Sequence, residues 1–124
     1  KKVAGMPDFR KLRVWEKAHY FTLQVYRITK NFPVDERFGL TAQLRRAAAS
    51  IPTNIAEGCG RGSEPELSRF MTIAAGSASE VEYQLFLAFD LNYILDEIHS
   101  ELNQQVNEIK MMLNRFIQQL TANC

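Results

Sequence analysis

Hydrophobic residues recur at alternating steps of three and four along almost the whole chain, which is the period of an amphipathic α-helix. No stretch of strict alternation is long enough to predict a β-strand. Because the connections between the periodic segments are short, the simplest packing is an antiparallel, up-down four-helix bundle of the all-α class, in a single domain. The predicted helices cover approximately residues 12–32, 40–58, 64–93 and 97–121.

Local signals mark several of the helix ends. The first helix is predicted to end before Pro33, because the residue that precedes a proline is pushed out of helical geometry. The third begins with a capping box, in which the Ser63 hydroxyl accepts a hydrogen bond from the amide of Glu66. Asp96 has the side chain of an N-cap for the fourth helix.

The second helix contains a proline, Pro52, in its interior. Its apolar positions keep the same phase on both sides of the proline, from Ala48 and Ile51 to Ile55. Proline removes one amide donor and leaves the carbonyl of Ala48 without its usual partner, which costs a straight helix about 3 kcal/mol. We therefore predict a helix that continues through Pro52 and is kinked there.

Polar residues form a second stripe along the same helix. Five of them follow steps of 4, 4, 3 and 4, so they share one edge: Arg46, Ser50, Asn54, Glu57 and Arg61. The third helix offers polar partners at steps of three and four: Ser77, Glu80 and Gln84. Since buried polar groups need hydrogen-bond partners, we favour a polar network between helices or subunits. A solvated edge and a ligand or RNA site are the alternatives.

The net charge of +1 conceals a strong division along the chain of 124 residues. Residues 1–61 hold 12 Lys and Arg against 5 Asp and Glu, whereas residues 62–124 hold 3 against 9. Such asymmetry indicates either a nucleic-acid-binding face or complementary surfaces that meet between subunits. No apolar run approaches the roughly 18 to 20 residues of a membrane span, so we expect a cytoplasmic protein without a membrane partner.

Seven basic residues are candidates for a nucleic-acid or subunit interface: Arg10, Lys11, Arg13, Lys17, Arg45, Arg46 and Arg61. Several such charges on one face suffice for sequence-independent binding of phosphates. Aromatic residues suited to base stacking are not expected among them, because Phe21, Phe32 and Phe70 fit the core. The same charges could instead meet the acidic helices of a neighbouring subunit. Trp15 lies at the border of the first apolar seam, as an interface anchor or as the edge of the core.

Metal and phosphate sites are not favoured by the sequence. Glu16 with His19, and Asp96 with His99, imitate the Glu-x-x-His pairs of di-metal bundles, but their helical phase places them away from the apolar seams. The glycine-rich stretch EGCGRGS lacks the lysine and the spacing of a phosphate-binding loop.

Nucleophilic catalysis is not favoured either. Cys59 and Ser63 have no histidine nearby in the sequence, and Cys59 and Cys124 are expected to be free thiols. We therefore expect no enzyme, no metal, no cofactor and no small-molecule substrate.

Three segments carry a resemblance to a known family: DFRKLRVWEKA, FGLTAQLRRAAASIPTNIAEGCGR and FMTIAAGSASEVE. They resemble the bacterial four-helix-bundle proteins named for the intervening sequence of 23S ribosomal RNA genes. The resemblance covers nearly the whole chain, although the fourth helix matches only as a generic amphipathic pattern. It implies a bundle that assembles into a ring of five identical subunits, with no established enzyme activity.

A related branch of that family is similar in fold. These accessory variability determinant proteins of diversity-generating retroelements bind a reverse transcriptase and nucleic acid through a basic surface. The present chain departs from them in being nearly neutral overall.

Together, these observations predict a non-catalytic, self-associating scaffold or binding module. RNA or a nucleic-acid enzyme is the expected partner of its basic N-terminal half. The alternative is a purely structural homo-oligomer without a nucleic-acid role, and an enzyme is the distant third. A closed ring requires two different patches to meet, and the two oppositely charged halves provide them.

Overall fold

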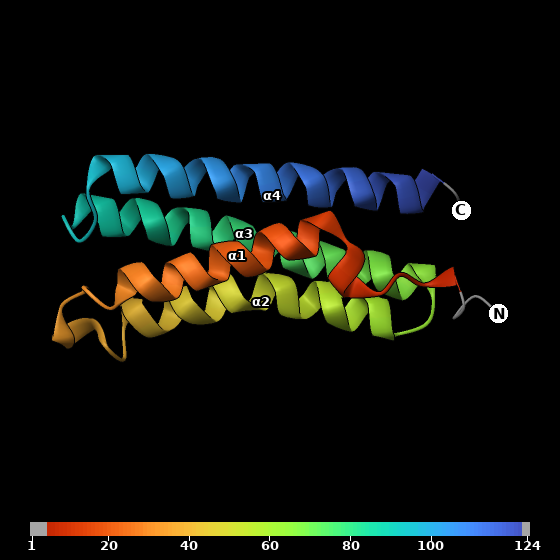
Figure 1. Cartoon of the computed structure of the whole chain (residues 1–124), viewed down its shortest axis with the longest axis horizontal. Helices are drawn as coiled ribbons and strands as arrows, with labels where there is room; N and C mark the ends of the chain where they lie inside the picture. Colours follow the sequence, from red (N-terminus) through yellow and green to blue (C-terminus); the bar gives the residue numbers. More distant parts are fainter. Residues whose placement is uncertain (1–4, 123–124) are drawn as a thin grey trace.

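A computed structural model describes residues 5–122, and four α-helices make up most of this range. They are α1 (Arg13–Thr29), α2 (Leu40–Gly60), α3 (Glu64–Asp90) and α4 (Asp96–Ala122). Two short 3₁₀ turns, η2 (Phe9–Lys11) and η3 (Val34–Glu36), precede and follow α1. Successive helices run in opposite directions (Figure 1), and the described range contains no strand. The predicted all-α, antiparallel four-helix bundle is confirmed.

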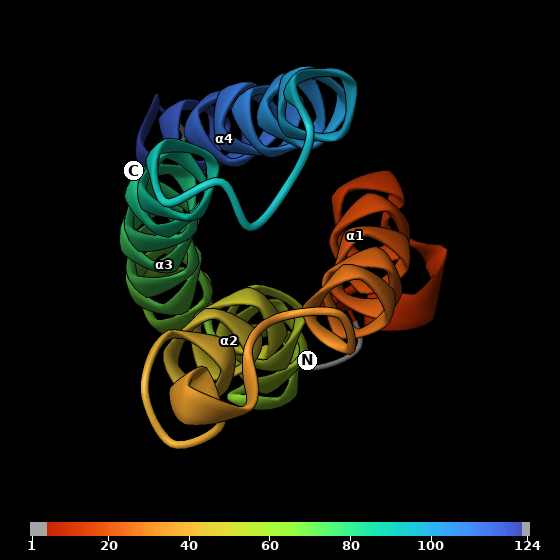
Figure 2. The same cartoon turned by 90° about the vertical axis from the view of Figure 1, so that its left-hand side faces the viewer.

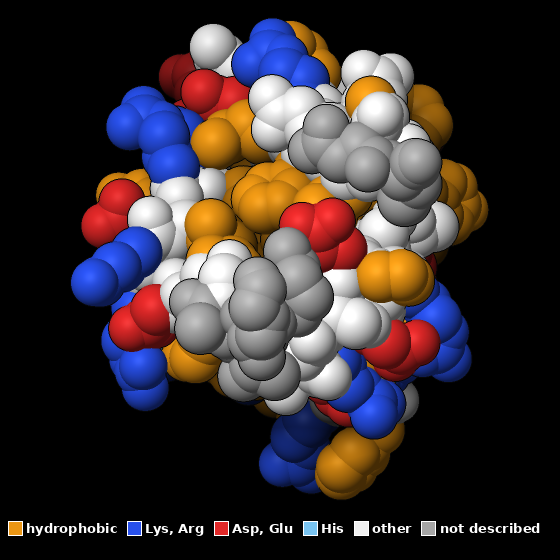
Figure 3. All heavy atoms as spheres, turned by 90° about the vertical axis from the view of Figure 1, so that its right-hand side faces the viewer, with side chains coloured by type: hydrophobic (Ala, Val, Ile, Leu, Met, Phe, Trp, Pro, Cys, Tyr) orange, Lys and Arg blue, Asp and Glu red, His pale blue; other side chains and the backbone are white. Residues whose placement is uncertain are grey.

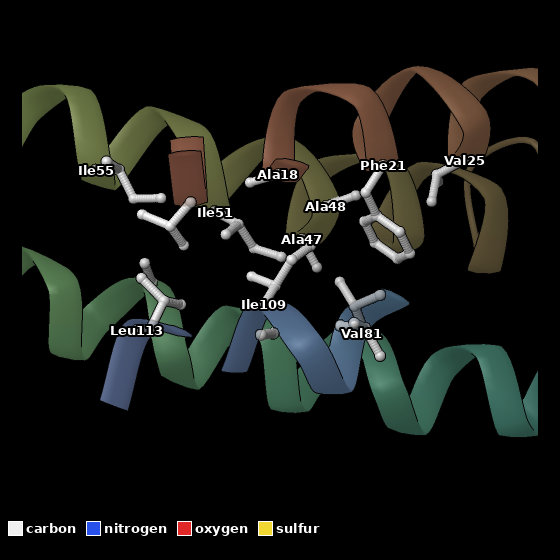
Figure 4. Packing of buried hydrophobic residues seen from close by; sticks show 14 of the residues in the cluster. Ala18, Phe21, Val25, Ala47, Ala48, Ile51, Ile55, Val81, Ile109 and Leu113 are labelled. Carbon is white, nitrogen blue, oxygen red and sulfur yellow. The ribbon is translucent and has the colours of Figure 1, made fainter. Parts of the chain in front are cut away.

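The helices surround one hydrophobic core. Seen along the bundle, α2 lies between α1 and α3, and α4 lies on α3 (Figure 2). Phe21 of α1, Ile51 of α2 and Ile109 of α4 are almost completely buried and point into the interior between the helices (Figure 4). Burial of each such side chain contributes about 1.5–3 kcal/mol, so the apolar seams account for the packing of the helices.

One end of the bundle is closed by residues that precede α1. Met6, Phe9 and Leu12 are partly buried and pack against the core. In the view onto this end, a band of hydrophobic side chains crosses the face, and Lys and Arg lie mainly along its margins (Figure 3). The turn η2 also carries Arg10 and Lys11, so it adds two cations at this end of the bundle.

The helix α2 continues through Pro52, and α1 places a shared hydroxyl donor beside the carbonyl that lacks its amide partner. The Thr22 hydroxyl lies 3.1 Å from the carbonyl oxygen of Ala48 and 2.8 Å from that of Ala18. Ala48 is the residue whose carbonyl Pro52 deprives of an amide donor. Thr22 and Pro52 are both largely buried, and the Thr22 hydroxyl shares its hydrogen between the carbonyls of Ala18 and Ala48, so it partly compensates for the missing amide. The kink at Pro52 stays a prediction.

Small residues bring α2 and α3 close together. Ala47, Ala74 and Ala78 are fully buried or nearly so. A Cβ atom at Gly58 would lie 2.9 Å from the Cβ of Phe70, so this glycine allows the start of α3 to approach α2. It does not end the helix, because α2 continues to Gly60, two residues beyond the predicted end at 58.

Several observed helix ends have clear local causes. Ser63 caps α3 by accepting a hydrogen bond from the Glu66 amide at 3.3 Å, as the capping box predicted. The helix α3 ends at Asp90, before Asn92, whose φ of 65° is left-handed. Asp96 is the first residue of α4 rather than the N-cap that precedes it, so that prediction is wrong by one position.

The substitution Thr22→Val should destabilise the protein by about 1–3 kcal/mol, because it leaves the buried Ala48 carbonyl without a donor. Urea denaturation measures the change. Thr72→Val is the matched control, since its exposed hydroxyl bonds only to the Ser68 carbonyl of its own helix. The control should change the free energy of unfolding by less than about 0.5 kcal/mol.

A double-mutant cycle isolates the cause. Pro52→Ala restores an amide donor to Ala48, so Thr22→Val should cost less in that background than in the natural sequence. An equal cost in both backgrounds would contradict the pairing.

Candidate functional site

The seven predicted basic residues do not form one free surface. Four of them have carboxylate partners: Arg10 pairs with Asp8, Lys17 with Glu108, Arg46 with Glu80, and Arg61 with both Glu57 and Glu66. The nitrogen–oxygen distances of these pairs range from 3.3 to 3.9 Å. Within the described residues, Lys11, Arg13 and Arg45 have no such partner.

The polar stripe of α2 lies against α3. The hydroxyls of Ser50 and Ser77 share a hydrogen bond of 2.8 Å, and Asn54 donates to the Ser50 hydroxyl at 2.9 Å. Next along the seam, Gln84 donates to Glu80 at 3.2 Å, and Arg46 pairs with the same carboxylate. These residues therefore connect two helices of one chain.

The far end of the stripe has a similar role. Arg61 lies between Glu57 of α2 and Glu66 in the first turn of α3, at 3.3 and 3.9 Å. Arg69 also pairs with Glu66, at 3.7 Å, so two cations and two carboxylates neutralise one another at the α2–α3 connection. The stripe thus offers few free charges to a polyanion.

Three cations without a carboxylate partner among the described residues lie together around the connection from α1 to α2, whereas Lys11 and Arg13 lie at the other end of α1. Lys30, Arg37 and Arg45 line one surface hollow of about 210 Å³, whose other walls come from the same connection and from Thr29 and Thr41. In the described part of the chain, none of these three cations has a carboxylate within ion-pair distance. Their charges are therefore available to an anion.

Arg45 is held rigidly in this cluster. Its Nε donates to the Thr29 hydroxyl at 2.7 Å and one Nη donates to the Tyr26 carbonyl at 3.3 Å. Both acceptors are uncharged, so the hydrogen bonds orient the guanidinium without neutralising it. The remaining guanidinium donors can still reach a phosphate.

Two exposed aromatic residues lie beside the cations of this hollow. Phe38 is 86% exposed, and Arg37 lies over its ring at 5.0 Å. Tyr26 is 43% exposed, and Arg45 lies over its ring at 4.8 Å. The expectation that stacking aromatics are absent from the basic surface is therefore wrong. We call the set of Tyr26, Lys30, Arg37, Phe38 and Arg45 the turn patch.

The sequence pattern missed most of the turn patch for a physical reason. Lys30, Arg37 and Phe38 lie outside the regular helices, where helical phase does not indicate which side chains share a face. Tyr26, by contrast, is on α1 and outside its apolar seam, so its phase could have identified it as exposed.

Glu36 fixes the conformation of this connection. One carboxylate oxygen accepts from the amide of Leu40, the first residue of α2, at 3.0 Å, and the other accepts from the Tyr93 hydroxyl at 2.9 Å. The bond from the Leu40 amide and then that from Tyr93 lower the pKa of Glu36 below its ordinary value. The bond to Glu36 in turn raises the pKa of Tyr93. Glu36 is therefore occupied, and it leaves the nearby cations unpaired.

Trp15 lies on the opposite part of α1, near its start. Its indole stacks on His19, with ring centroids 5.0 Å apart, and contacts Phe9 edge-on at 4.9 Å. The side chain is half-buried and packs against the core.

The described residues do not favour a metal site or a reactive thiol. No three His, Cys, Asp or Glu side chains come together there in a way that could hold a metal ion. Cys59 is a buried free thiol, and burial followed by the charge of Asp8 raises its pKa, which disfavours the reactive thiolate. Cys124 lies outside the described residues. None of the four helices described combines the length and apolar character that a bilayer-spanning segment needs.

Comparisons with known proteins agree with this architecture. A family model of the 23S rRNA-intervening sequence protein matches residues 10–115. The chain is also similar to a crystal structure of a protein with unknown function from the S23 ribosomal protein family of Bacteroides thetaiotaomicron. The two share 28% sequence identity with a TM-score of 0.76, over 84% of this chain and 97% of that one. A search of curated proteins finds no match, and the relation to retroelement accessory proteins stays a prediction.

The bonds of Glu36 predict a pH dependence of stability. Because the folded-state pKa of Glu36 is lowered, its contribution is complete above the ordinary glutamate pKa of about 4.3 and is lost as the pH falls through the lowered value. Glu36→Gln should remove this contribution and make the urea midpoint less dependent on pH in the acid range. Glu97→Gln, at an exposed position in the first turn of α4, is the control. An unchanged acid slope in Glu36→Gln would contradict the assignment.

Proposed function

Since the chain belongs to the family of 23S rRNA-intervening sequence proteins, we propose that it is a non-catalytic binding module whose turn patch binds single-stranded RNA. One observation supports this most: three cations without carboxylate partners surround a single hollow and lie beside two exposed aromatic rings. The family name associates these proteins with ribosomal RNA, and a partner of that kind suits a cytoplasmic protein.

The chemistry of the turn patch fits a single strand better than a duplex. Arginine and lysine neutralise phosphates without regard to sequence. An unpaired base can stack on a protruding ring such as that of Phe38, and base stacking on aromatic residues contributes about 1–3 kcal/mol per base. In a duplex the bases are already stacked and paired, so the ring would gain no partner.

Self-association is a second proposal, supported by a different surface. Tyr83 and Phe86 of α3 and Leu95 beside α4 are more than half exposed, at 60%, 51% and 70%. Tyr83 and Phe86 line one hollow together, and large apolar side chains exposed together are typical of interaction sites. The ring of five subunits implied by the family resemblance is the assembly that we propose. A purely structural homo-oligomer is the alternative, and it would leave the turn patch without a ligand.

The double substitution Lys30→Glu with Arg37→Glu should abolish binding of a short labelled oligouridine, measured by fluorescence anisotropy. If each of the three cations neutralises one phosphate, the logarithm of the oligouridine affinity of the natural protein should fall as the logarithm of the salt concentration rises, with a slope of about −2. Arg115→Glu on α4 is the matched control, because this exposed cation also has no carboxylate partner among the described residues. Equal loss in both variants, or no binding by the natural protein at about 50 mM salt, would contradict the proposal.

Phe38→Ala tests stacking separately from charge. Loss of one stacked base should weaken oligouridine binding by about 5- to 150-fold, while the salt slope stays unchanged. Met111→Ala is the control, since Met111 is an exposed apolar residue of α4 that does not line the hollow and has no aromatic ring. Binding that is as tight in Phe38→Ala as in the control would exclude stacking at this position.

A further inference from the structure

The hollow of the turn patch holds more positive charge than one internal RNA phosphate can neutralise. Lys30, Arg37 and Arg45 line it, and the described residues supply no carboxylate to any of them. A phosphodiester inside a strand carries a single negative charge, whereas a terminal phosphate monoester carries about 1.5 to 2 at pH 7 and offers three acceptor oxygens. The charge of the hollow therefore matches the end of a strand better than its interior.

A hydroxyl without a partner lines the same hollow. Thr41, the second residue of α2, is only 8% exposed, and its hydroxyl has no hydrogen-bond partner among the described residues. The other threonine of the hollow is engaged, because the Thr29 hydroxyl donates to the Val25 carbonyl at 2.8 Å and accepts from Arg45 at 2.7 Å. Since buried polar groups normally have a partner, the Thr41 hydroxyl indicates a ligand that brings an acceptor oxygen.

Acceptors of the protein itself do not compete for these donors. At the end of α1, the carbonyls of Arg27, Ile28 and Thr29 each accept a hydrogen bond of 3.1 to 3.3 Å from an amide three residues ahead. The two carboxylates of the connection, Asp35 and Glu36, do not line the hollow, and Glu36 is engaged in its own hydrogen bonds. The donors of the hollow are therefore available to an anion.

The remaining lining residues favour a strand that ends at the hollow. Three consecutive ones, Phe32, Pro33 and Val34, have no side-chain donor. The backbone of an internal phosphate continues in two directions, whereas that of a terminal phosphate continues in one and need not cross these apolar residues. Arg37 lines the hollow and also lies over the exposed ring of Phe38, so a strand can leave the hollow beside a stacking surface.

We propose that the hollow of the turn patch binds the terminal phosphate monoester of a single-stranded RNA. The three cations neutralise the phosphate, Thr41 donates to one of its oxygens, and the rings of Tyr26 and Phe38 remain for bases. This inference rests on the proposed function and names the part of the RNA that is recognised. RNA binding does not depend on it, because a strand without an end phosphate still meets the cations with its internal phosphates.

Short oligouridines with and without an end phosphate test the inference by fluorescence anisotropy. One carries a 5′-phosphate, one a 3′-phosphate, and the hydroxyl-ended strands carry the label at the same positions. The natural protein should bind one phosphorylated strand about 10- to 150-fold more tightly than its hydroxyl-ended match, as expected for hydrogen bonds to a charged group. Equal affinities at both ends would overturn the inference and leave RNA binding standing. No binding of any strand would overturn the proposed function itself.

Two variants locate the bound phosphate. Thr41→Val removes one hydroxyl without a change of charge and should reduce the preference for the phosphorylated strand by about 2- to 10-fold. Arg45→Gln should remove most of that preference. Arg27→Gln is the matched control, because Arg27 is an exposed cation near the end of α1 that does not line the hollow. Circular dichroism checks that each variant keeps its helices. A preference that is unchanged in Thr41→Val and Arg45→Gln would overturn the site.

Competition with uridine monophosphate distinguishes a strand end from a free nucleotide. The nucleotide carries the same phosphate but only one base, so it can occupy only one of the two exposed rings. It should therefore displace the phosphorylated oligouridine only at a concentration about 5- to 150-fold higher than the unlabelled oligouridine requires. Displacement at equal concentrations would overturn the assignment to a strand end.

Discussion

The continuity of α2 at its proline is the local constraint from which the α1–α2 interface follows, and α1 supports it with a hydrogen bond. Pro52 deprives the Ala48 carbonyl of its amide donor, and the Thr22 hydroxyl lies 3.1 Å from that carbonyl in the buried interface of the two helices. With this bond, α2 remains one helix and can pack against α1 on one side and α3 on the other. Without it, the Ala48 carbonyl would lose this donor at the α1–α2 interface, where Tyr26 of α1 and Arg45 of α2 form part of the turn patch.

The pairing of charges decides which cations can bind a ligand. Carboxylates of α3 and α4 neutralise cations along the helix seams, as in the pairs of Lys17 with Glu108 and Lys110 with Glu82. At the connection from α1 to α2, Glu36 instead accepts hydrogen bonds from an amide and a hydroxyl. The cations beside it therefore keep their charge. The basic half of the sequence is thus not uniformly basic as a surface, and three of its cations that are unpaired among the described residues, Lys30, Arg37 and Arg45, line one hollow where the chain turns.

Periodic features of the sequence predicted the architecture, whereas contacts between distant residues did not follow from it. The three-and-four spacing indicated the helices, and the Ser63 cap, predicted from the local sequence, is present in the structure. The spacing also singled out polar residues of α2 and α3 that lie within hydrogen-bonding distance. Thr22, however, is 26 residues from its partner Ala48, and no local rule connects them. The turn patch was missed because helical phase carries no information in a connection such as that around Phe38.

Ultraviolet crosslinking of bound oligouridine, with crosslinked peptides identified by mass spectrometry, tests the central claim most directly. An aromatic ring that stacks on a base can form a covalent crosslink with it, so the crosslinked residue identifies the contact. Tyr26 and Phe38 are the exposed rings of the turn patch. The account predicts crosslinks within residues 26–45, and most strongly at Phe38. Crosslinks confined to α3 and α4 would contradict it.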